Sequence, residues 1–102
     1  MFIAIYQFEV IQGQEEQFKE SWNALTKLII KYENSVGSRL HHADGQVYIA
    51  YAQWYSREQW ENAGSNLPDI ADEFRKQMKA SCSEIKTIHE LEVIDDLLKG
   101  NV

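Results

Sequence analysis

Two segments of this 102-residue chain are apolar on both faces when they are read as β-strands, and this feature constrains the fold most. From Phe2 to Val10 the residues are mainly β-branched and aromatic, and Gln12-Gly13 marks the turn that ends the run. The segment from Gln46 to Tyr55 has the same character. Because side chains alternate between the two faces of a strand, strands of this composition are covered from both sides in a folded protein.

The rest of the chain supplies helices and two further strands. Apolar residues recur at spacings of three and four from Gln14 to Tyr32, which predicts an amphipathic helix. Asp44-Gly45 is a strong hairpin signal, and Ser56 with Gln59 three residues later predicts the start of a short helix. In chain order, we expect a strand over 2–10, a helix over 14–32, strands over 38–43 and 46–55, a short helix from 56, a helix over about 68–80 and a strand over about 84–94.

This β-α-β-β-α-β order predicts an α+β ferredoxin-like sandwich, in which one antiparallel sheet carries both helices on one face. The other face of the sheet would then expose large apolar side chains, which water does not tolerate as a broad patch. We therefore expect a homodimer in which the sheets of two copies cover each other. The whole chain, 1–102, is expected to form one domain, with the tail over 95–102 as a frayed end or an arm that contacts the partner.

Composition excludes several functional classes. Ten Lys and Arg against 16 Asp and Glu give a net charge of −6, and the basic residues are scattered, so a nucleic-acid surface is not expected. Cys82 is the only cysteine, which excludes intramolecular disulfides and is typical of a protein of the reducing cytoplasm. The N-terminal apolar run lacks a basic region and is interrupted by Gln7 and Glu9, so neither export nor membrane insertion is expected.

Three stretches of the sequence carry a family resemblance. They are 10–18 at the end of the first strand, Val36-Gly37-Ser38 at the second strand, and 51–60, whose Trp54-Tyr55-Ser56-Arg57-Glu58-Gln59-Trp60 has the form Trp-x-Ser-x-Glu-x-aromatic. On these residues the chain resembles the antibiotic biosynthesis monooxygenase family of dimeric α/β-barrel proteins. The resemblance implies two protomers that join their sheets into a barrel, with a pocket between sheet and helices in each. It also implies oxidation of an aromatic substrate by molecular oxygen without a metal or flavin cofactor.

Some relatives in this family degrade haem instead, and that branch fits the chain poorly. They use an asparagine near the end of the first strand, with a tryptophan and a histidine on the second helical region. Here Gln7 stands at about the asparagine position, Trp60 falls about three residues before the tryptophan position, and residues 67–80 contain no histidine. Without an axial imidazole, haem ligation is not expected, and we expect no cofactor.

His42, His89 and Trp54 are the candidate catalytic residues. His41 and His42 are adjacent in a strand and therefore point to opposite faces, so they cannot hold one metal ion together, and no metal site is expected. Either His42 or His89 could act as a base in a dry pocket, or could be a structural histidine that is hydrogen-bonded or exposed to solvent. Trp54 ends a central strand, where sheet, second helix and pocket would meet.

Aromatic side chains are the candidate contacts for a flat ligand, since stacking rings and phenol hydroxyls recognise such molecules. We select Tyr51, Trp60 and Trp22, together with Gln7, as substrate-binding residues. The alternative is that these rings fill the core and the dimer barrel, which is the more common fate of a helical stripe such as that of Trp22. The wider set of candidates also includes Tyr6, Tyr48 and Tyr55.

Other chemistries are less well supported by the sequence. Glu90 and Glu92 share a strand face, but charges near a sheet edge more often protect against aggregation than form an acid and base pair. Cys82 reads as an inert thiol. RNA-recognition motifs and acylphosphatases share the element order, but the Lys/Arg-Gly of the first and the loop arginine of the second are absent here.

The function predicted from the sequence is therefore a cofactor-independent monooxygenase that acts on a small aromatic or quinol-like metabolite. A non-catalytic dimeric module that only binds such a ligand is the main alternative. An isomerase or lyase that uses a pocket base without oxygen is a third.

Overall fold

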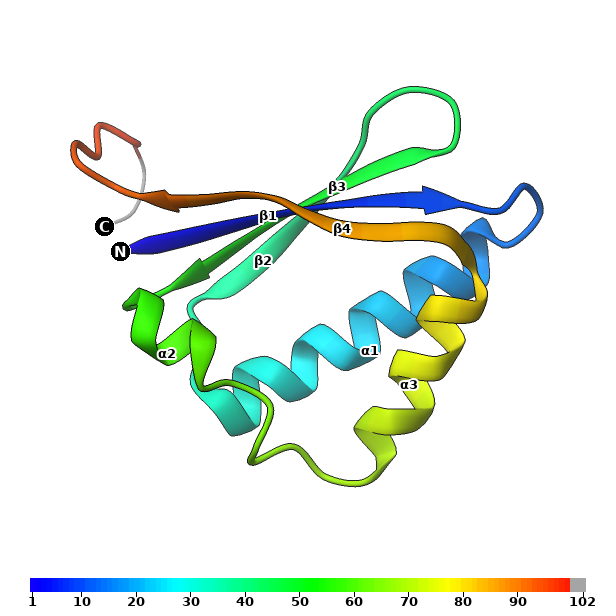
Figure 1. The fold of residues 1–102 in the computed structure, drawn as a ribbon, viewed down its shortest axis with the longest axis horizontal. Coiled ribbons are helices and arrows are strands. Elements are labelled where there is room, and N and C mark those ends of the chain that lie inside the picture. Colours follow the sequence, from blue (N-terminus) through cyan, green and yellow to red (C-terminus); the bar gives the residue numbers. More distant parts are fainter. Residues whose placement is uncertain (100–102) are drawn as a thin grey trace.

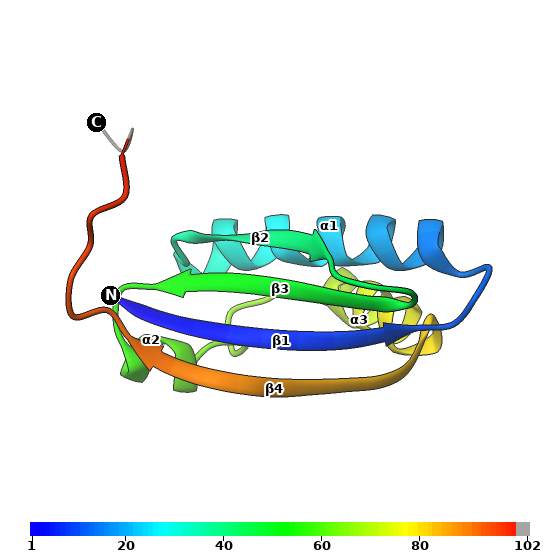
Figure 2. The ribbon, with the colours of Figure 1, turned by 90° about the horizontal axis from the view of Figure 1, so that it is seen from above.

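A four-stranded antiparallel sheet with helices against one of its faces forms the framework of the protein (Figure 1). The computed structural model describes residues 1–99. Its elements are β1 (Phe2–Val10), α1 (Glu15–Glu33), β2 (Gly37–His42), β3 (Val47–Trp54), α2 (Arg57–Glu61), α3 (Ile70–Ala80) and β4 (Cys82–Glu92). The strand order is β2-β3-β1-β4, so the two most apolar strands are central, as predicted (Figure 2). The predicted ferredoxin-like α+β fold is confirmed.

The long helix α1 packs on the sheet through one stripe of its surface. Phe18, Ser21 and Leu25 are buried at spacings of three and four, as the amphipathic pattern requires. Two glutamates occupy its first turn and Lys31 its last, which complements the helix dipole. The helix ends at Asn34, whose left-handed backbone (φ 57°) turns the chain towards β2. No helix among residues 1–99 is long and apolar enough to cross a bilayer.

The short helix α2 begins with the capping arrangement that the sequence predicts. The Ser56 hydroxyl accepts a hydrogen bond from the Gln59 backbone N–H at 3.1 Å. In return, Gln59 Oε1 accepts a hydrogen bond from the backbone N–H of Tyr55 at 2.8 Å. This cap fixes where α2 leaves the end of β3.

Most element boundaries after β1 differ from the predicted ones by one or two residues. The helix α1 spans Glu15–Glu33 rather than 14–32, the strands β2 and β3 span Gly37–His42 and Val47–Trp54 rather than 38–43 and 46–55, and α3 begins at Ile70, two residues after Pro68. The last strand covers Cys82–Glu92 rather than 84–94, because the chain returns from α3 to the sheet without an intervening loop. Cys82 therefore opens β4, and the predicted tail begins earlier, at Val93. The part of the tail over 100–102 lies outside the described residues.

A β-bulge in β4 changes which of its side chains share a face. Ile5 pairs with His89, whereas Tyr6 pairs with Thr87, so Ile88 is an extra residue with no partner on β1. Thr87 therefore lies on the helix-facing side of the sheet, while His89 lies on the other side. Strict alternation along the sequence would predict that Thr87 and His89 share one apolar face, and that prediction is wrong because the inserted residue Ile88 shifts the alternation.

The sheet face away from the helices, here called the open face, is less aromatic than expected. Of the rings on β1 and β3, the cross-strand register places only Tyr51 there, while the others face the helices. Its apolar residues are Ile3, Ile5, Val47, Ile49, Tyr51 and Leu91, and Gln7, Arg39, His41, Gln53 and His89 lie among them. The open face is thus a mixed surface with an aliphatic centre.

Candidate functional site

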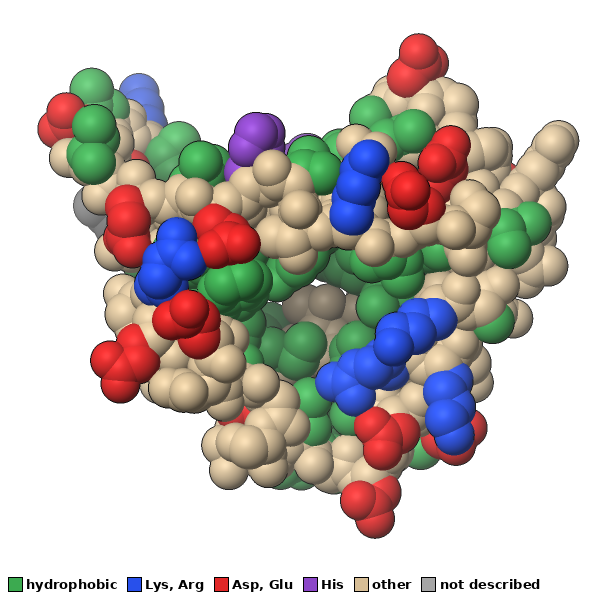
Figure 3. All heavy atoms as spheres, viewed as in Figure 1, with side chains coloured by type: hydrophobic (Ala, Val, Ile, Leu, Met, Phe, Trp, Pro, Cys, Tyr) green, Lys and Arg blue, Asp and Glu red, His purple; other side chains and the backbone are tan. Residues whose placement is uncertain are grey.

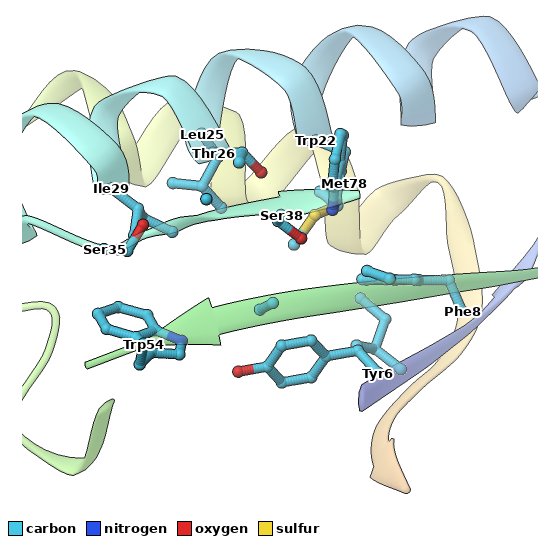
Figure 4. A pocket seen from close by; sticks show the side chains of 14 residues that line it. Tyr6, Phe8, Trp22, Leu25, Thr26, Ile29, Ser35, Ser38, Trp54 and Met78 are labelled. Carbon is cyan, nitrogen blue, oxygen red and sulfur yellow. The ribbon is translucent and has the colours of Figure 1, made fainter. Parts of the chain in front are cut away.

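A cavity of about 200 Å³ lies between the sheet and the helices. Figure 3 shows a hollow with hydrophobic walls between the strand layer and the helix layer, and Figure 4 shows the side chains that line it. The lining residues are Tyr6, Phe8, Trp22, Leu25, Thr26, Ile29, Ser35, Gly37, Ser38, Ala50, Ala52, Trp54, Met78 and Ile85. Such a cavity suits a small apolar ligand that makes few polar contacts.

The cavity exists because small residues stand where the core would otherwise be filled. On its helix-facing side β3 carries Tyr48, Ala50, Ala52 and Trp54, which is a large, small, small, large order. Ala4 of β1 lies directly opposite Ala52 and adds no bulk. The two alanines of β3 and Trp54 line the space, whereas Tyr48 is not part of its lining.

Tyr6 brings a phenol hydroxyl to the cavity wall, and Trp60 holds it. The Trp60 indole Nε1–H donates a hydrogen bond of 2.7 Å to the Tyr6 hydroxyl oxygen. Trp60 is itself packed on Phe2, with the ring centroids 5.1 Å apart. Burial raises the pKa of Tyr6; the Trp60 hydrogen bond opposes this rise, and the negative charge of Glu90 adds to it. The Tyr6 hydroxyl is therefore protonated at neutral pH.

Trp54 closes one end of the cavity with an unsatisfied donor. Its side chain is buried, with an exposed fraction of 4%. Within residues 1–99, its indole Nε1 is the one buried side-chain polar atom without a hydrogen-bond partner. Figure 4 shows that this nitrogen and the Tyr6 hydroxyl point towards each other along the cavity floor. A buried N–H without an acceptor costs about 1–3 kcal/mol, so a ligand that supplies an acceptor would recover that free energy.

The remaining polar groups of the lining are small hydroxyls. The Ser38 hydroxyl donates to the Tyr51 carbonyl oxygen at 3.0 Å, and Thr26 and Ser35 add two more hydroxyls. Tyr6 is the only titratable side chain in the lining. Across residues 1–99, no group of three or more His, Cys, Asp and Glu side chains is arranged so that it could hold a metal ion. The cavity can bind and orient a neutral flat molecule, and its lining carries no carboxylate or imidazole base.

Three of the predicted site residues come together here. Trp22 and Trp54 line the cavity from α1 and β3, and Trp60 lies one hydrogen bond behind its wall. Trp54 and Trp60 are 32 and 38 positions after Trp22 in the sequence, and the fold brings all three to the helix-facing side of β1.

The other four predicted site residues lie elsewhere. His42 is at the hairpin end of β2, where its Nε2 lies 2.8 Å from the Gly45 carbonyl oxygen and its ring 4.8 Å from that of Tyr48. His89, Gln7 and Tyr51 are on the open face. That His42 or His89 acts as a base stays a prediction, and such a base would not be part of this cavity.

Tyr6 lines the cavity although the sequence places it only in the wider set of aromatic candidates. Its immediate neighbours in the sequence do not distinguish it from the other rings. A signal was nonetheless present, because Tyr6 is on the same strand face as Ala4, and Ala50 and Ala52 alternate with large residues on the neighbouring strand. Small residues flanked by rings on one strand face indicate a space that a ligand can fill.

Comparison with known proteins agrees with this architecture. The model of the antibiotic biosynthesis monooxygenase family matches residues 1–80. No curated protein sequence matches the chain. Among solved structures, SnoaB from Streptomyces nogalater, a cofactor-independent oxygenase, is 14% identical, with a TM-score of 0.75 over 94% of this chain and 95% of its own. Rv0793 from Mycobacterium tuberculosis is 13% identical, with a TM-score of 0.73 over 95% of this chain and 98% of its own. At these identities, the structural likeness shows a shared fold.

Proposed function

The chain belongs to the antibiotic biosynthesis monooxygenase family, and on that basis we propose that it is a cofactor-independent monooxygenase of a small aromatic or quinol-like metabolite. The observation that carries the proposal is the cavity between sheet and helices. Its walls are mainly apolar, two tryptophans line it, and the hydrogen-bonding groups of Tyr6 and Trp54 reach it. These are properties that a flat substrate of low polarity requires.

In this reaction the substrate itself supplies the electrons. One atom of O₂ replaces hydrogen at a ring carbon of a phenol, and the other atom leaves as water, so a naphthol becomes a naphthoquinone with all atoms balanced. The protein holds the ring, binds the substrate oxygen on which negative charge develops and excludes bulk water. Because the lining offers no carboxylate or imidazole, the pH dependence of turnover would follow the ionisation of the substrate's own hydroxyl.

The same absence of a base from the cavity lining favours a second candidate function. A protein that only binds an aromatic ligand needs the apolar walls and the hydrogen-bonding groups but no proton acceptor. In that case the cavity would sequester or carry the ligand without changing it. The two candidates make the same prediction for binding and opposite predictions for oxygen consumption.

Oxygen consumption therefore decides between them. We would measure O₂ uptake with a panel of hydroquinones and naphthols, and follow ¹⁸O from ¹⁸O₂ into the product by mass spectrometry. Incorporation of one labelled atom per product, lost when Ala52→Leu fills the cavity, is the result expected of a monooxygenase. Tight binding of the same compounds without uptake would identify the protein as a binder.

We also propose that two copies associate through the open face. Its apolar residues Ile5, Ile49, Tyr51 and Leu91 support this proposal because they lie on the side that the helices leave uncovered. Leu97 of the tail, an exposed apolar residue, borders the same hollow as Tyr51 and Gln53 of the open face and would add to the contact. The cavity is on the opposite side of the sheet, so pairing of this kind leaves it accessible.

A further inference from the structure

The hydrogen bond between Trp60 and Tyr6 sets the direction in which the Tyr6 proton can point. An indole N–H can only donate, so the Tyr6 oxygen must be the acceptor in this pair. The hydroxyl keeps its own proton, and among residues 1–99 that proton is not donated to any protein acceptor. Since the side towards α2 is occupied by Trp60, the proton is left facing the cavity that Tyr6 lines.

We propose that the cavity is a two-donor site that selects ligands with an acceptor oxygen, a ketone or quinone carbonyl or an ionised hydroxyl. The donors are the Tyr6 O–H and the Trp54 Nε1–H, and Trp60 is a positioning residue that fixes Tyr6 as a donor. This inference rests on the proposed function only in placing the ligand in the cavity, and it names the chemical class of that ligand.

The two donors are rigid, which is what selectivity requires. Trp60 is held on α2, whose first turn is capped by Ser56, and its ring packs on Phe2. Arg57 of the same helix lies over the Phe2 ring at 4.8 Å and bonds to Glu90 of β4 at 2.6 Å. These contacts join α2 to the sheet on the far side of Tyr6. The donor geometry is therefore built before any ligand arrives.

The protonation of Tyr6 supports the same assignment. Its pKa is raised by burial, against the opposing effect of the Trp60 hydrogen bond and with a further contribution from the Glu90 charge. A hydroxyl that stays protonated over the neutral pH range remains a donor. The Trp54 donor does not titrate at all.

Such a site distinguishes ligands that carry a hydrogen-bond acceptor from ligands of the same shape without one. A hydrocarbon of the same shape offers the Trp54 N–H no acceptor, whereas a ketone can satisfy both donors. Two neutral hydrogen bonds together should make the ketone bind about five- to a hundredfold more tightly than the matched hydrocarbon. In the proposed reaction this preference would favour the phenolate and the quinone product over the neutral phenol.

The test uses 1-tetralone and tetralin, which share a two-ring skeleton and differ in one carbonyl. Dissociation constants are measured by calorimetry on the full chain, and the carbonyl stretch of bound 1-tetralone is measured by infrared difference spectroscopy. We expect tighter binding of the ketone and a carbonyl frequency below that in an alkane solvent. Equal affinities, or a carbonyl frequency like that in the alkane, would overturn the proposal without the need for any variant.

Three variants locate the effect. Tyr6→Phe should reduce the ketone preference about three- to tenfold and raise the carbonyl frequency. Trp60→Phe keeps an aromatic ring on Phe2 but frees the Tyr6 hydroxyl to turn, so it should reduce the preference by a smaller factor. Tyr48→Phe is the matched control, since Tyr48 does not line the cavity, and it should change neither readout. An unchanged preference in Tyr6→Phe would remove Tyr6 from the site, and an unchanged preference in Trp60→Phe would remove its positioning role.

These readouts are independent of oxygen chemistry. A ketone preference without O₂ uptake would leave the two-donor site intact and disprove the monooxygenase. Uptake without a ketone preference would do the reverse. If neither probe binds, the cavity is not a ligand site, and the two-donor proposal fails with it.

Discussion

Glu33 and Asn66 are joined by two hydrogen bonds that tie the end of α1 to the loop before α3. Glu33 Oε2 accepts from the Asn66 backbone N–H at 3.0 Å, and Oε1 accepts from the Asn66 side-chain amide at 3.1 Å. The same carboxylate accepts a third bond, at 2.6 Å, from the backbone N–H of Gly64. Glu33 is buried, so the loop is held by a charged group with little contact to water.

Glu33→Gln should therefore destabilise the fold by about 1–3 kcal/mol. The glutamine keeps one neutral acceptor oxygen, and its NH₂ group replaces the other carboxylate oxygen, so a donor then faces the N–H donors of the loop. At roughly 4–8 °C per kcal/mol for a domain of this size, Tm should fall by several degrees. Glu16→Gln, in an exposed first-turn position, is the control and should have little effect. Equal Tm values for the two variants would mean that the clamp adds no stability.

The same clamp predicts a loss of stability in acid. Burial alone would raise the pKa of Glu33, but the hydrogen bonds from the Asn66 backbone, the Asn66 amide and Gly64 outweigh it and lower the pKa below 4.5. A lowered carboxyl pKa gives stability that is complete above the unfolded value of 4.5 and disappears as the pH falls through the folded value. The Tm difference between wild type and Glu33→Gln should thus shrink progressively in melts as the pH falls below 4.5.

Trp54→Phe separates binding from stability. The indole N–H has no partner, so its removal relieves an unpaired buried donor while the smaller ring gives up some packing, and we expect Tm to change by only a few degrees. Affinity for a ketone ligand should fall about three- to tenfold.

His42→Ala and His89→Ala test the predicted catalytic histidines in the same assays. A loss of turnover that is fully accounted for by a loss of thermal stability would assign these histidines structural roles.

Ala52→Leu should block the cavity with little cost to the fold. The added side chain points into the cavity beside Ala50, so it gains contacts with the lining residues and does not displace packed atoms. We expect ligand affinity to fall at least about tenfold, with Tm retained or raised. Ala43→Leu, in the exposed hairpin, is the matched control for the added bulk. Undiminished binding in Ala52→Leu would place the ligand outside this cavity.

Cys82 should react slowly with thiol reagents. Burial raises the pKa of its thiol to about 11, so at pH 8 the thiolate fraction is roughly a hundredfold lower than for a cysteine with the usual value of 9.0. Modification followed spectrophotometrically should be slow in the native protein, faster at pH 10 and fast after unfolding in guanidinium. Rapid native modification at pH 8 would show that the thiol is ionised or exposed.

Ile49→Asp should separate the proposed dimer into monomers. Ile49 lies at the centre of the open face, opposite Gln7 and His41, and a carboxylate there would have to be buried against the partner. Ile70→Asp on α3 is the control, because Ile70 is half exposed on the helix side of the protein. Multi-angle light scattering at micromolar concentration should give a dimer mass for wild type and Ile70→Asp. A monomer mass for the wild type would disprove the pairing.

The elements and their order follow from local patterns in the sequence, and these patterns are strong here. The helical spacing, the Asp44-Gly45 turn and the Ser56 cap each act over a few residues, so each could be read directly. The site depends on which strand face a residue occupies. Trp54 and Tyr51 are three positions apart on one strand and therefore face opposite ways, and this rule alone separates them.

The position of His89 could not be obtained in the same way. Its face depends on the bulge at Ile88, which is a property of the pairing between two strands and leaves no local mark in the sequence. The cavity beside Ala50 likewise depends on how the helices pack on the sheet, because Trp22 of α1 and Met78 of α3 border it. Contacts between distant segments decide both features.

The bulge at Ile88 also determines which residues in the second half of β4 face the helices and which lie on the open face. Before it, Ile85 faces the cavity; after it, Glu90 takes the same side and meets Arg57, while His89 and Leu91 turn outward. Deleting Ile88 would leave these faces unchanged, whereas pairing Ile88 in a regular ladder would turn His89 and Leu91 towards α2 and Glu90 towards the open face. The contact between Glu90 and Arg57 therefore depends on the bulge, and a variant that straightens β4 would exchange the two sets of side chains over the second half of the strand.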